Sequence, residues 1–138
     1  MTDEGDVQER AAALKRLRSL LGGMGSSKVT LIGDVMLDRF HHGYANNLDS
    51  TAPVPVLKIL RSVETPGAAA HIAMGLNSLG LSVSLHCCVG DDREGKIIIE
   101  KLSDDGIDTS GVGVVPGRNT LTKIRFYGSR ESLLDKSQ

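Results

Sequence analysis

At 138 residues the chain has the length of one domain, and 16 Lys and Arg residues against 17 Asp and Glu residues leave a formal net charge of −1. Without a basic surface, and with 3% aromatic residues and no Trp, the composition argues against binding to nucleic acid or to an anionic membrane. No apolar stretch reaches the roughly 20 residues of a membrane-spanning helix, and the acidic N-terminus argues against a secretory signal. We therefore expect a cytoplasmic protein in which the adjacent Cys87 and Cys88 are a buried, reduced pair, and not a disulfide or a redox or metal site.

The first third of the chain predicts a helix, a strand and a loop. Leucines recur at helical spacing over residues 7–21, Asp6 is a candidate N-cap, and Gly22-Gly23 would end the helix in the left-handed conformation. The short apolar run at 28–33 is typical of a buried strand in a parallel sheet. Residues 38–52 are polar and rich in turn formers, so we expect a loop there.

The remainder alternates between strand and helix patterns. Prolines cannot donate to a strand ladder, so Pro53 and Pro55 place residues 52–60 in an edge strand. Glycines at 80 and 106 would end the two helices. The elements expected after the edge strand are a helix at 66–78, a strand at 83–89, a helix at 92–104, and strands at 112–115 and 120–127. This order predicts half of an open α/β sheet with extra strands that need not belong to it.

Two carboxylates follow the strand at 28–33, at the end of the sheet where α/β proteins bind ligands. Asp34 comes directly after Gly33, and we interpret both as turn residues, with the Asp34 carboxylate capping nearby backbone N–H groups. Asp38 is the better ligand candidate, because a carboxylate accepts paired hydrogen bonds from sugar hydroxyls or binds a metal.

Metal binding has only weak support elsewhere in the chain. We interpret Asp91 as the N-cap of the helix at 92–104 with Glu94 as its capping-box partner, and a Mg²⁺ pair at Asp91 and Asp92 is the alternative. His41 and His42 lack a spaced third ligand, so we expect surface residues there. The sequence therefore predicts no metal site.

Two cations, Lys123 and Arg125, share one face of the last predicted strand. Such a pair can hold a phosphate, and the alternative is an exposed strand edge protected by charge. The sequence has no P-loop, no complete dinucleotide-binding fingerprint and no G-x-S-x-G nucleophile motif.

Several of these stretches, in this order, resemble the PfkB (ribokinase-like) carbohydrate kinases, and among them the kinase domain of the heptose 7-phosphate kinase/ADP-heptose synthase group. The stretches that carry the resemblance are GDVMLDRF at 33–40, APVPV at 52–56, PGAAAHIA at 66–73, VGDD at 89–92 with Gly95, GIDT at 106–109 and TLTKIR at 120–125. The resemblance implies an α/β fold, the N-terminal part of a ribokinase-like three-layer sheet with extra β strands as a lid. It also implies ATP-dependent phosphorylation of a sugar or a sugar phosphate, with ATP and Mg²⁺ as cofactors.

The resemblance also implies roles for individual residues. Asp38 would hold sugar hydroxyls, the loop from Gly67 to His71 would pack on the sugar, and Lys123 would meet a substrate phosphate. Where the family has a second glycine and an asparagine, this chain has Ala68 and His71. Both differences bear on which sugar is bound.

The family's Gly-Ala-Gly-Asp base motif and its nucleotide site lie in its C-terminal half, which the 138 residues do not include. We therefore expect an N-terminal tail and helix at 1–27, a partial kinase domain at 28–138, no catalytic residue and no turnover by this chain alone. The alternatives are a non-catalytic binding or interaction protein, which pairs with a second copy or with a separate C-terminal half through its lid strands, and a truncated gene product.

Overall fold

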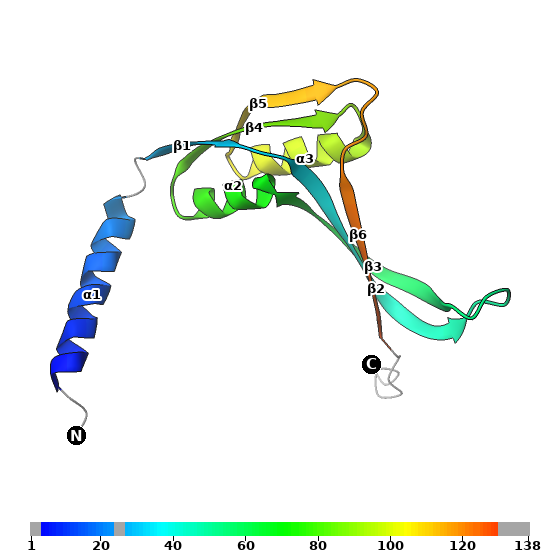
Figure 1. Ribbon diagram of the computed structural model, residues 1–138, viewed down its shortest axis with the longest axis horizontal. Coiled ribbons are helices and arrows are strands. Elements are labelled where there is room, and N and C mark those ends of the chain that lie inside the picture. Colours follow the sequence, from blue (N-terminus) through cyan, green and yellow to red (C-terminus); the bar gives the residue numbers. More distant parts are fainter. Residues whose placement is uncertain (1–3, 24–26, 130–138) are drawn as a thin grey trace.

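The computed structural model describes residues 4–23 and 27–129, which form helices and two separate sheets (Figure 1). The elements in chain order are α1 (Glu4–Gly23), β1 (Lys28–Ile32), β2 (Val35–Leu48), β3 (Pro55–Ala68), α2 (Ala69–Ser78), β4 (Ser82–Gly90), α3 (Arg93–Asp104), β5 (Asp108–Val115) and β6 (Thr122–Ser129). One sheet has the strand order β1-β4-β5 and the other the order β3-β2-β6.

The parallel sheet β1-β4-β5 carries α2 and α3 on one face (Figure 1). Leu85 of β4, Ala73 of α2 and Ile98 of α3 are fully buried in the core between the sheet and these helices. The prediction of a parallel strand at 28–33 is confirmed, but β1 is an edge strand and not a buried one, since Ile32 is 79% exposed.

The two cysteines of β4 point to opposite faces of this sheet. Cys87 is half-buried against the helices, whereas Cys88 is exposed, and neither forms a disulfide. Burial raises the pKa of the Cys87 thiol to about 11. The prediction of a buried pair is therefore wrong for Cys88.

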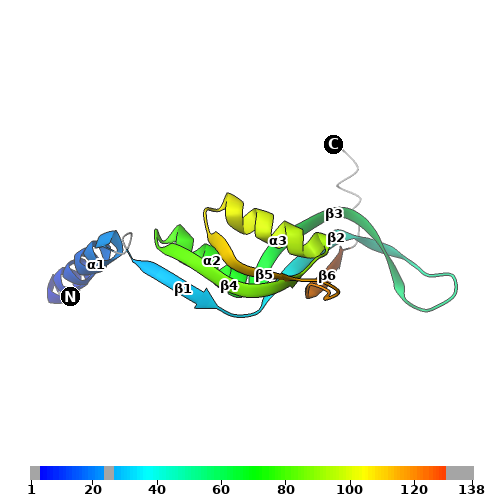
Figure 2. The same cartoon turned by 90° about the horizontal axis from the view of Figure 1, so that it is seen from above.

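The second sheet, β3-β2-β6, extends away from the parallel sheet (Figures 1 and 2). We call it the lid sheet. Its central strand β2 pairs antiparallel with β3 and parallel with β6. The loop predicted at 38–52 is wrong, because this polar segment stays extended as far as Leu48, paired with β3 along this length and with β6 as far as Tyr44. The edge-strand prediction is confirmed, with β3 beginning at Pro55.

Helices α2 and α3 end in the same C-terminal motif. Gly80 and Gly106 end the two helices, as predicted, and both adopt positive φ. The N–H of the following residue donates to the carbonyl of the third-last helical residue, from Leu81 to Leu76 and from Ile107 to Leu102. Leu81 and Ile107 are also buried. Each stop therefore directs the chain into the core.

Helix α1 stands apart from both sheets, with its leucines exposed (Figure 1). It begins at Glu4, so Asp6 lies inside it, paired with Arg10 at 2.9 Å, and is not the predicted N-cap. Gly22 and Gly23 lie in the helix without the predicted positive φ. Among the described residues, no helix has the length and apolar character needed to cross a membrane.

Candidate functional site

A cavity of about 480 Å³ lies where the lid sheet meets the start of α2. All three lid strands and α2 contribute side chains to it. The residues that line it are Asp38, Phe40, Thr65, Pro66, Ala68, His71, Arg125 and Tyr127. Asp38 contributes a carboxylate, Arg125 a guanidinium and His71 an imidazole, while Phe40 and Tyr127 contribute aromatic rings.

An ion pair between Asp38 and Arg125 crosses the lid sheet from β2 to β6. The Arg125 Nη1 donates to the Asp38 Oδ1 at 2.7 Å, and both side chains are partly buried. The guanidinium also lies 4.9 Å from the centre of the Phe40 ring, which is its cross-strand neighbour. Phe40 in turn stacks on Tyr127 with ring centres 6.2 Å apart. Arg125 is therefore held by a carboxylate and an aromatic face together.

The end of β3 is shaped by close approach to Asp38. A Cβ at Gly67 would clash with the Asp38 Oδ2, so a larger residue would have to displace this carboxylate, which is paired with Arg125. The next residue, Ala68, has φ 55° and ψ −127°, a backbone conformation that glycine adopts far more readily than alanine. The Ala69 N–H then donates to the Asp34 carbonyl at 3.0 Å, and α2 begins.

Four of the six predicted substrate residues, Asp38, Ala68, His71 and Arg125, line the cavity. Gly67 lies directly beside it, against Asp38. Lys123 pairs with Asp38 in the β2–β6 ladder, but it is exposed and does not line the cavity. Their roles toward a substrate stay predictions.

The two turn residues contact their neighbours through the backbone. The Gly33 N–H donates to the His86 carbonyl at 3.2 Å, and the Asp34 carbonyl accepts from Ala69. The Asp34 side chain is exposed. The structure thus gives Asp34 a backbone contact at this turn.

Sequence reasoning missed the aromatic residues of the cavity. Phe40 lies two residues after Asp38, and Tyr127 lies two residues after Arg125. Because side chains alternate between the faces of a strand, this spacing indicates that each aromatic shares a face with the charged residue. Thr65 and Pro66 had no comparable signal, since they depend on the pairing of β3 with β2.

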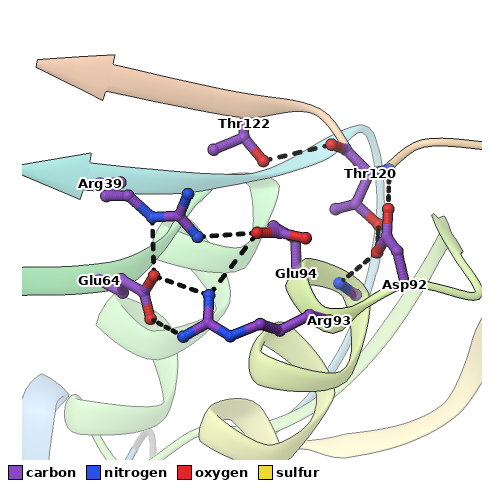
Figure 3. A network of polar contacts seen from close by, with 8 residues as sticks. Arg39, Glu64, Asp92, Arg93, Glu94, Thr120 and Thr122 are labelled. Carbon is purple, nitrogen blue, oxygen red and sulfur yellow. Dashed lines mark hydrogen bonds and ion pairs between the residues drawn. The ribbon is translucent and has the colours of Figure 1, made fainter.

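The start of α3 is capped by Asp92, and the prediction that Asp91 is the cap is wrong. The Asp92 Oδ1 accepts from the Gly95 N–H at 2.8 Å, and its carboxylate also accepts from the N–H and the hydroxyl of Thr120, both at 2.7 Å (Figure 3). These hydrogen bonds, led by that from the Thr120 N–H, lower the pKa of Asp92. Asp91 is exposed, and its Oδ1 lies 3.5 Å from the Lys96 Nζ.

A cluster of four charges lies on the other face of the lid sheet (Figure 3). Arg39 of β2 donates to Glu64 of β3 at 2.7 Å and to Glu94 of α3 at 2.8 Å, and Arg93 donates to Glu64 at 3.2 Å. Glu94, predicted as a capping-box partner, therefore pairs with Arg39. In the described part of the chain, no three His, Cys, Asp or Glu side chains gather into a group that could hold a metal.

The pKa values in this cluster follow from its ion pairs. The hydrogen bond from Arg39 lowers the pKa of Glu94, and the same contact raises the pKa of Arg39. Burial opposes ionisation of Glu64, but hydrogen bonds from Arg93 and Arg39 outweigh it and lower the pKa of this carboxyl. These shifts favour the charged forms of Arg39, Glu64 and Glu94.

Comparison of the sequence with known proteins identifies relatives of this chain. Residues 26–134 match the pfkB family carbohydrate kinases. The chain is 39% identical over 106 residues to the bifunctional protein HldE of Magnetococcus marinus, covering 77% of this chain and 22% of that protein. It is also 39% identical over 119 residues to HldE of Hyphomonas neptunium, covering 86% and 24%. The chain thus spans about a quarter of the length of the curated relatives it matches.

Solved structures agree with the fold. An uncharacterized sugar kinase from Pyrococcus horikoshii in complex with ATP superposes with a TM-score of 0.53 at 25% identity, covering 70% of this chain and 30% of that one. Halothermothrix orenii fructokinase superposes with a TM-score of 0.54 at 22% identity, covering 72% and 33%, and supports the fold alone. These findings confirm the predicted ribokinase-like α/β fold. Because the family match extends over most of the sequence, this chain belongs to the pfkB family of carbohydrate kinases.

Proposed function

We propose that this chain forms the sugar-binding part and the lid of a kinase that transfers a phosphoryl group from ATP to a hydroxyl of a sugar or a sugar phosphate. The observation that carries the proposal is the Asp38–Arg125 pair in the cavity between the lid sheet and α2. Membership of the pfkB family supports the reaction class.

The cavity has the chemical groups that a sugar phosphate requires. The Asp38 carboxylate accepts hydrogen bonds from sugar hydroxyls, and the rings of Phe40 and Tyr127 offer apolar surface to the sugar ring. Arg125 provides a guanidinium for a phosphate, and Lys123 on the same face of β6 adds a second cation nearby. The resemblance to the heptose kinase group makes heptose 7-phosphate the first candidate substrate.

Two residues would tune the choice of sugar. Ala68 places a methyl group at the cavity wall, where the family has glycine, and His71 replaces an amide by an imidazole. Both line the cavity, so both support a substrate preference of this chain's own.

We further propose that ATP and Mg²⁺ bind outside this site and that the 138 residues alone transfer no phosphate. Neither a Gly-Ala-Gly-Asp motif nor a P-loop pattern occurs in the sequence. Measurable turnover of MgATP and a sugar by the pure chain would contradict this part.

The proposal is tested by calorimetric titration and thermal unfolding of the chain with heptose 7-phosphate, heptose and MgATP. We expect heptose 7-phosphate to raise the melting midpoint, because a ligand of the folded state stabilises it, and MgATP alone to leave it unchanged. Asp38→Asn should weaken sugar-phosphate binding about 10-fold or more, because a hydrogen bond to a charged group is lost.

The matched control is Glu100→Gln, which makes the same kind of change at an exposed position of α3. It should bind like the unchanged chain. If no sugar or sugar phosphate binds, or if Asp38→Asn binds as tightly as the control, the sugar-binding proposal is wrong.

The second candidate is an interaction protein that pairs through its lid strands with a second copy or with a separate C-terminal half. The supporting observation is that β3 and β6 are both edges of the lid sheet and expose apolar side chains, among them Ile59, Leu60, Ile124 and Phe126.

A further inference from the structure

The charged cluster on the face of the lid sheet opposite the cavity connects this sheet to helix α3 of the α/β layer. Arg39 and Glu64 belong to lid strands β2 and β3, whereas Arg93 and Glu94 are the first two residues of α3 in the other layer (Figure 3). Arg39 contacts both layers, with its Nε on the Glu64 Oε1 and its Nη2 on the Glu94 Oε1. We call these four residues the lid anchor.

Three of the four lid-anchor side chains are largely buried, unlike the ion pairs on the surface, and the fourth, Arg93, is 66% exposed. The Arg39, Glu64 and Glu94 side chains are 17%, 22% and 25% exposed, whereas Arg10 and Asp6 in the α1 pair are 76% and 55% exposed. Exposed pairs contribute little, because water and salt screen them. A partly buried network with alternating charges holds its partners in place more strongly, because removing one charge leaves others desolvated and unpaired.

The lid anchor acts on the same stretch of backbone that carries the cavity. Arg39 directly follows Asp38, so the two side chains lie on opposite faces of β2. In the β2–β3 ladder Asp38 pairs with Thr65 and Arg39 pairs with Glu64. Any shift of Arg39 relative to α3 therefore moves Asp38 and, through their ion pair, Arg125.

We propose that the lid anchor fixes the lid sheet against α3 and thereby holds Asp38 and Arg125 at the position that the substrate requires. Arg39 is then a positioning residue, which contacts no substrate itself. The effect on substrate rests on the proposed function, whereas the effect on the lid sheet is measurable on the chain without any ligand.

The test compares Arg39→Gln, Arg39→Lys and Glu94→Gln with the control Arg10→Gln, which breaks the exposed Asp6–Arg10 pair on α1. Hydrogen exchange is measured at the amides of β2, β3 and β4. Tyrosine fluorescence gives a second readout of the lid sheet, because the chain has no Trp and its two tyrosines, Tyr44 and Tyr127, lie on β2 and β6.

We expect Arg39→Gln to speed exchange at residues 35–40 and 63–67 about 10-fold or more while the β4 core amides keep their rates, and to change the tyrosine emission. Arg39→Lys should show the same faster exchange in the lid sheet, because one ammonium cannot reproduce the contacts that the guanidinium makes with Glu64 and Glu94. Glu94→Gln should give the same pattern in weaker form, since Arg39 keeps Glu64. Heptose 7-phosphate should bind Arg39→Gln about 10-fold more weakly, and Arg10→Gln should change nothing.

Two outcomes of the hydrogen-exchange measurement would overturn the proposal. If Arg39→Gln speeds exchange equally at the lid and β4 amides, the cluster stabilises the whole fold and not the lid sheet in particular. If exchange changes at neither, the cluster does not hold the lid sheet. If Arg39→Gln loosens the lid selectively but the unchanged chain binds no sugar phosphate, the lid anchor stands and the proposed function fails. If the unchanged chain binds sugar phosphate and Arg39→Gln binds it equally well with a loosened lid, the positioning role is wrong while the proposed function stands.

Discussion

Ala68 is the one non-glycine residue with positive φ among the described residues. Its φ of 55° and ψ of −127° lie in a region that costs an L-residue on the order of 1–3 kcal/mol. The strain sits at the cavity wall, one residue after the glycine that admits Asp38. The surrounding contacts therefore impose a conformation that the alanine itself disfavours.

Replacing this residue tests the strain directly. Ala68→Gly should raise the free energy of unfolding by about 1 kcal/mol, because relief of strain exceeds the entropy that glycine adds to the unfolded chain. Ala69→Gly, the matched control at the first helical position of α2, should lower it by about 0.5–1 kcal/mol. Urea unfolding measures both, and a destabilised Ala68→Gly would contradict the strain.

At the scale of elements, the start of α3 also holds the start of the lid strand β6. The Asp92 carboxylate caps α3 through Gly95 and fixes Thr120, whose hydroxyl also accepts from the Gly90 N–H at 2.8 Å. The chain enters β6 two residues after Thr120. Asp92 and Thr120 together therefore join the end of β4, the helix and the lid sheet.

Asp92→Ala should lower the free energy of unfolding by about 2 kcal/mol, because the helix loses its cap and the Thr120 N–H loses its partner. Asp91→Ala, the matched control one residue earlier, should change it by less than about 0.5 kcal/mol, because its pair with Lys96 is exposed. Urea unfolding at neutral pH separates the two variants, and equal effects would contradict the assignment of the cap.

The same comparison depends on pH in a defined direction. The pKa of Asp92 is lowered from its ordinary value of 3.8, so its stabilising effect is complete above that value. It is lost as the pH falls through the lowered pKa, where the folded state also takes up the proton. The difference in the free energy of unfolding between the unchanged chain and Asp92→Ala should therefore become smaller as the pH falls through the lowered pKa of Asp92.

At the scale of the whole molecule, the lid sheet exposes apolar side chains, and no strand of the described residues pairs with its outer strands β3 and β6 on their outer edges. If a second copy pairs there, the mass from light scattering should rise with concentration, and Phe126→Lys should shift it toward the monomer. The control is the chain without residues 1–23, which should associate like the full chain, because α1 stands apart from the lid sheet (Figure 1). A monomer at all concentrations would contradict pairing of copies.

Much of the α/β layer could be predicted from local sequence, because its signals are local. Apolar runs mark β4, and the glycines at 80 and 106 end α2 and α3 through a positive φ that other residues disfavour. The sequence also indicated Asp38 and Arg125 as ligand candidates, and the structure places both in the lining of the cavity. The sequence did not allow a choice between Asp91 and Asp92 as the N-cap of α3, because the hydrogen bond that favours Asp92 comes from Thr120, 28 residues away.

The sequence by itself determined the family, the strands of the parallel sheet, the glycine stops of α2 and α3 and the charged cavity residues Asp38 and Arg125, since each shows in patterns of residues close together in the chain. Only the tertiary structure decided that the polar segment after Asp38 is a strand, that Phe40 and Tyr127 stack beside Arg125, and that Arg39 joins the lid sheet to α3. These features depend on ladder pairing and ion pairs between residues that are distant in the chain, and local sequence patterns do not identify such partners.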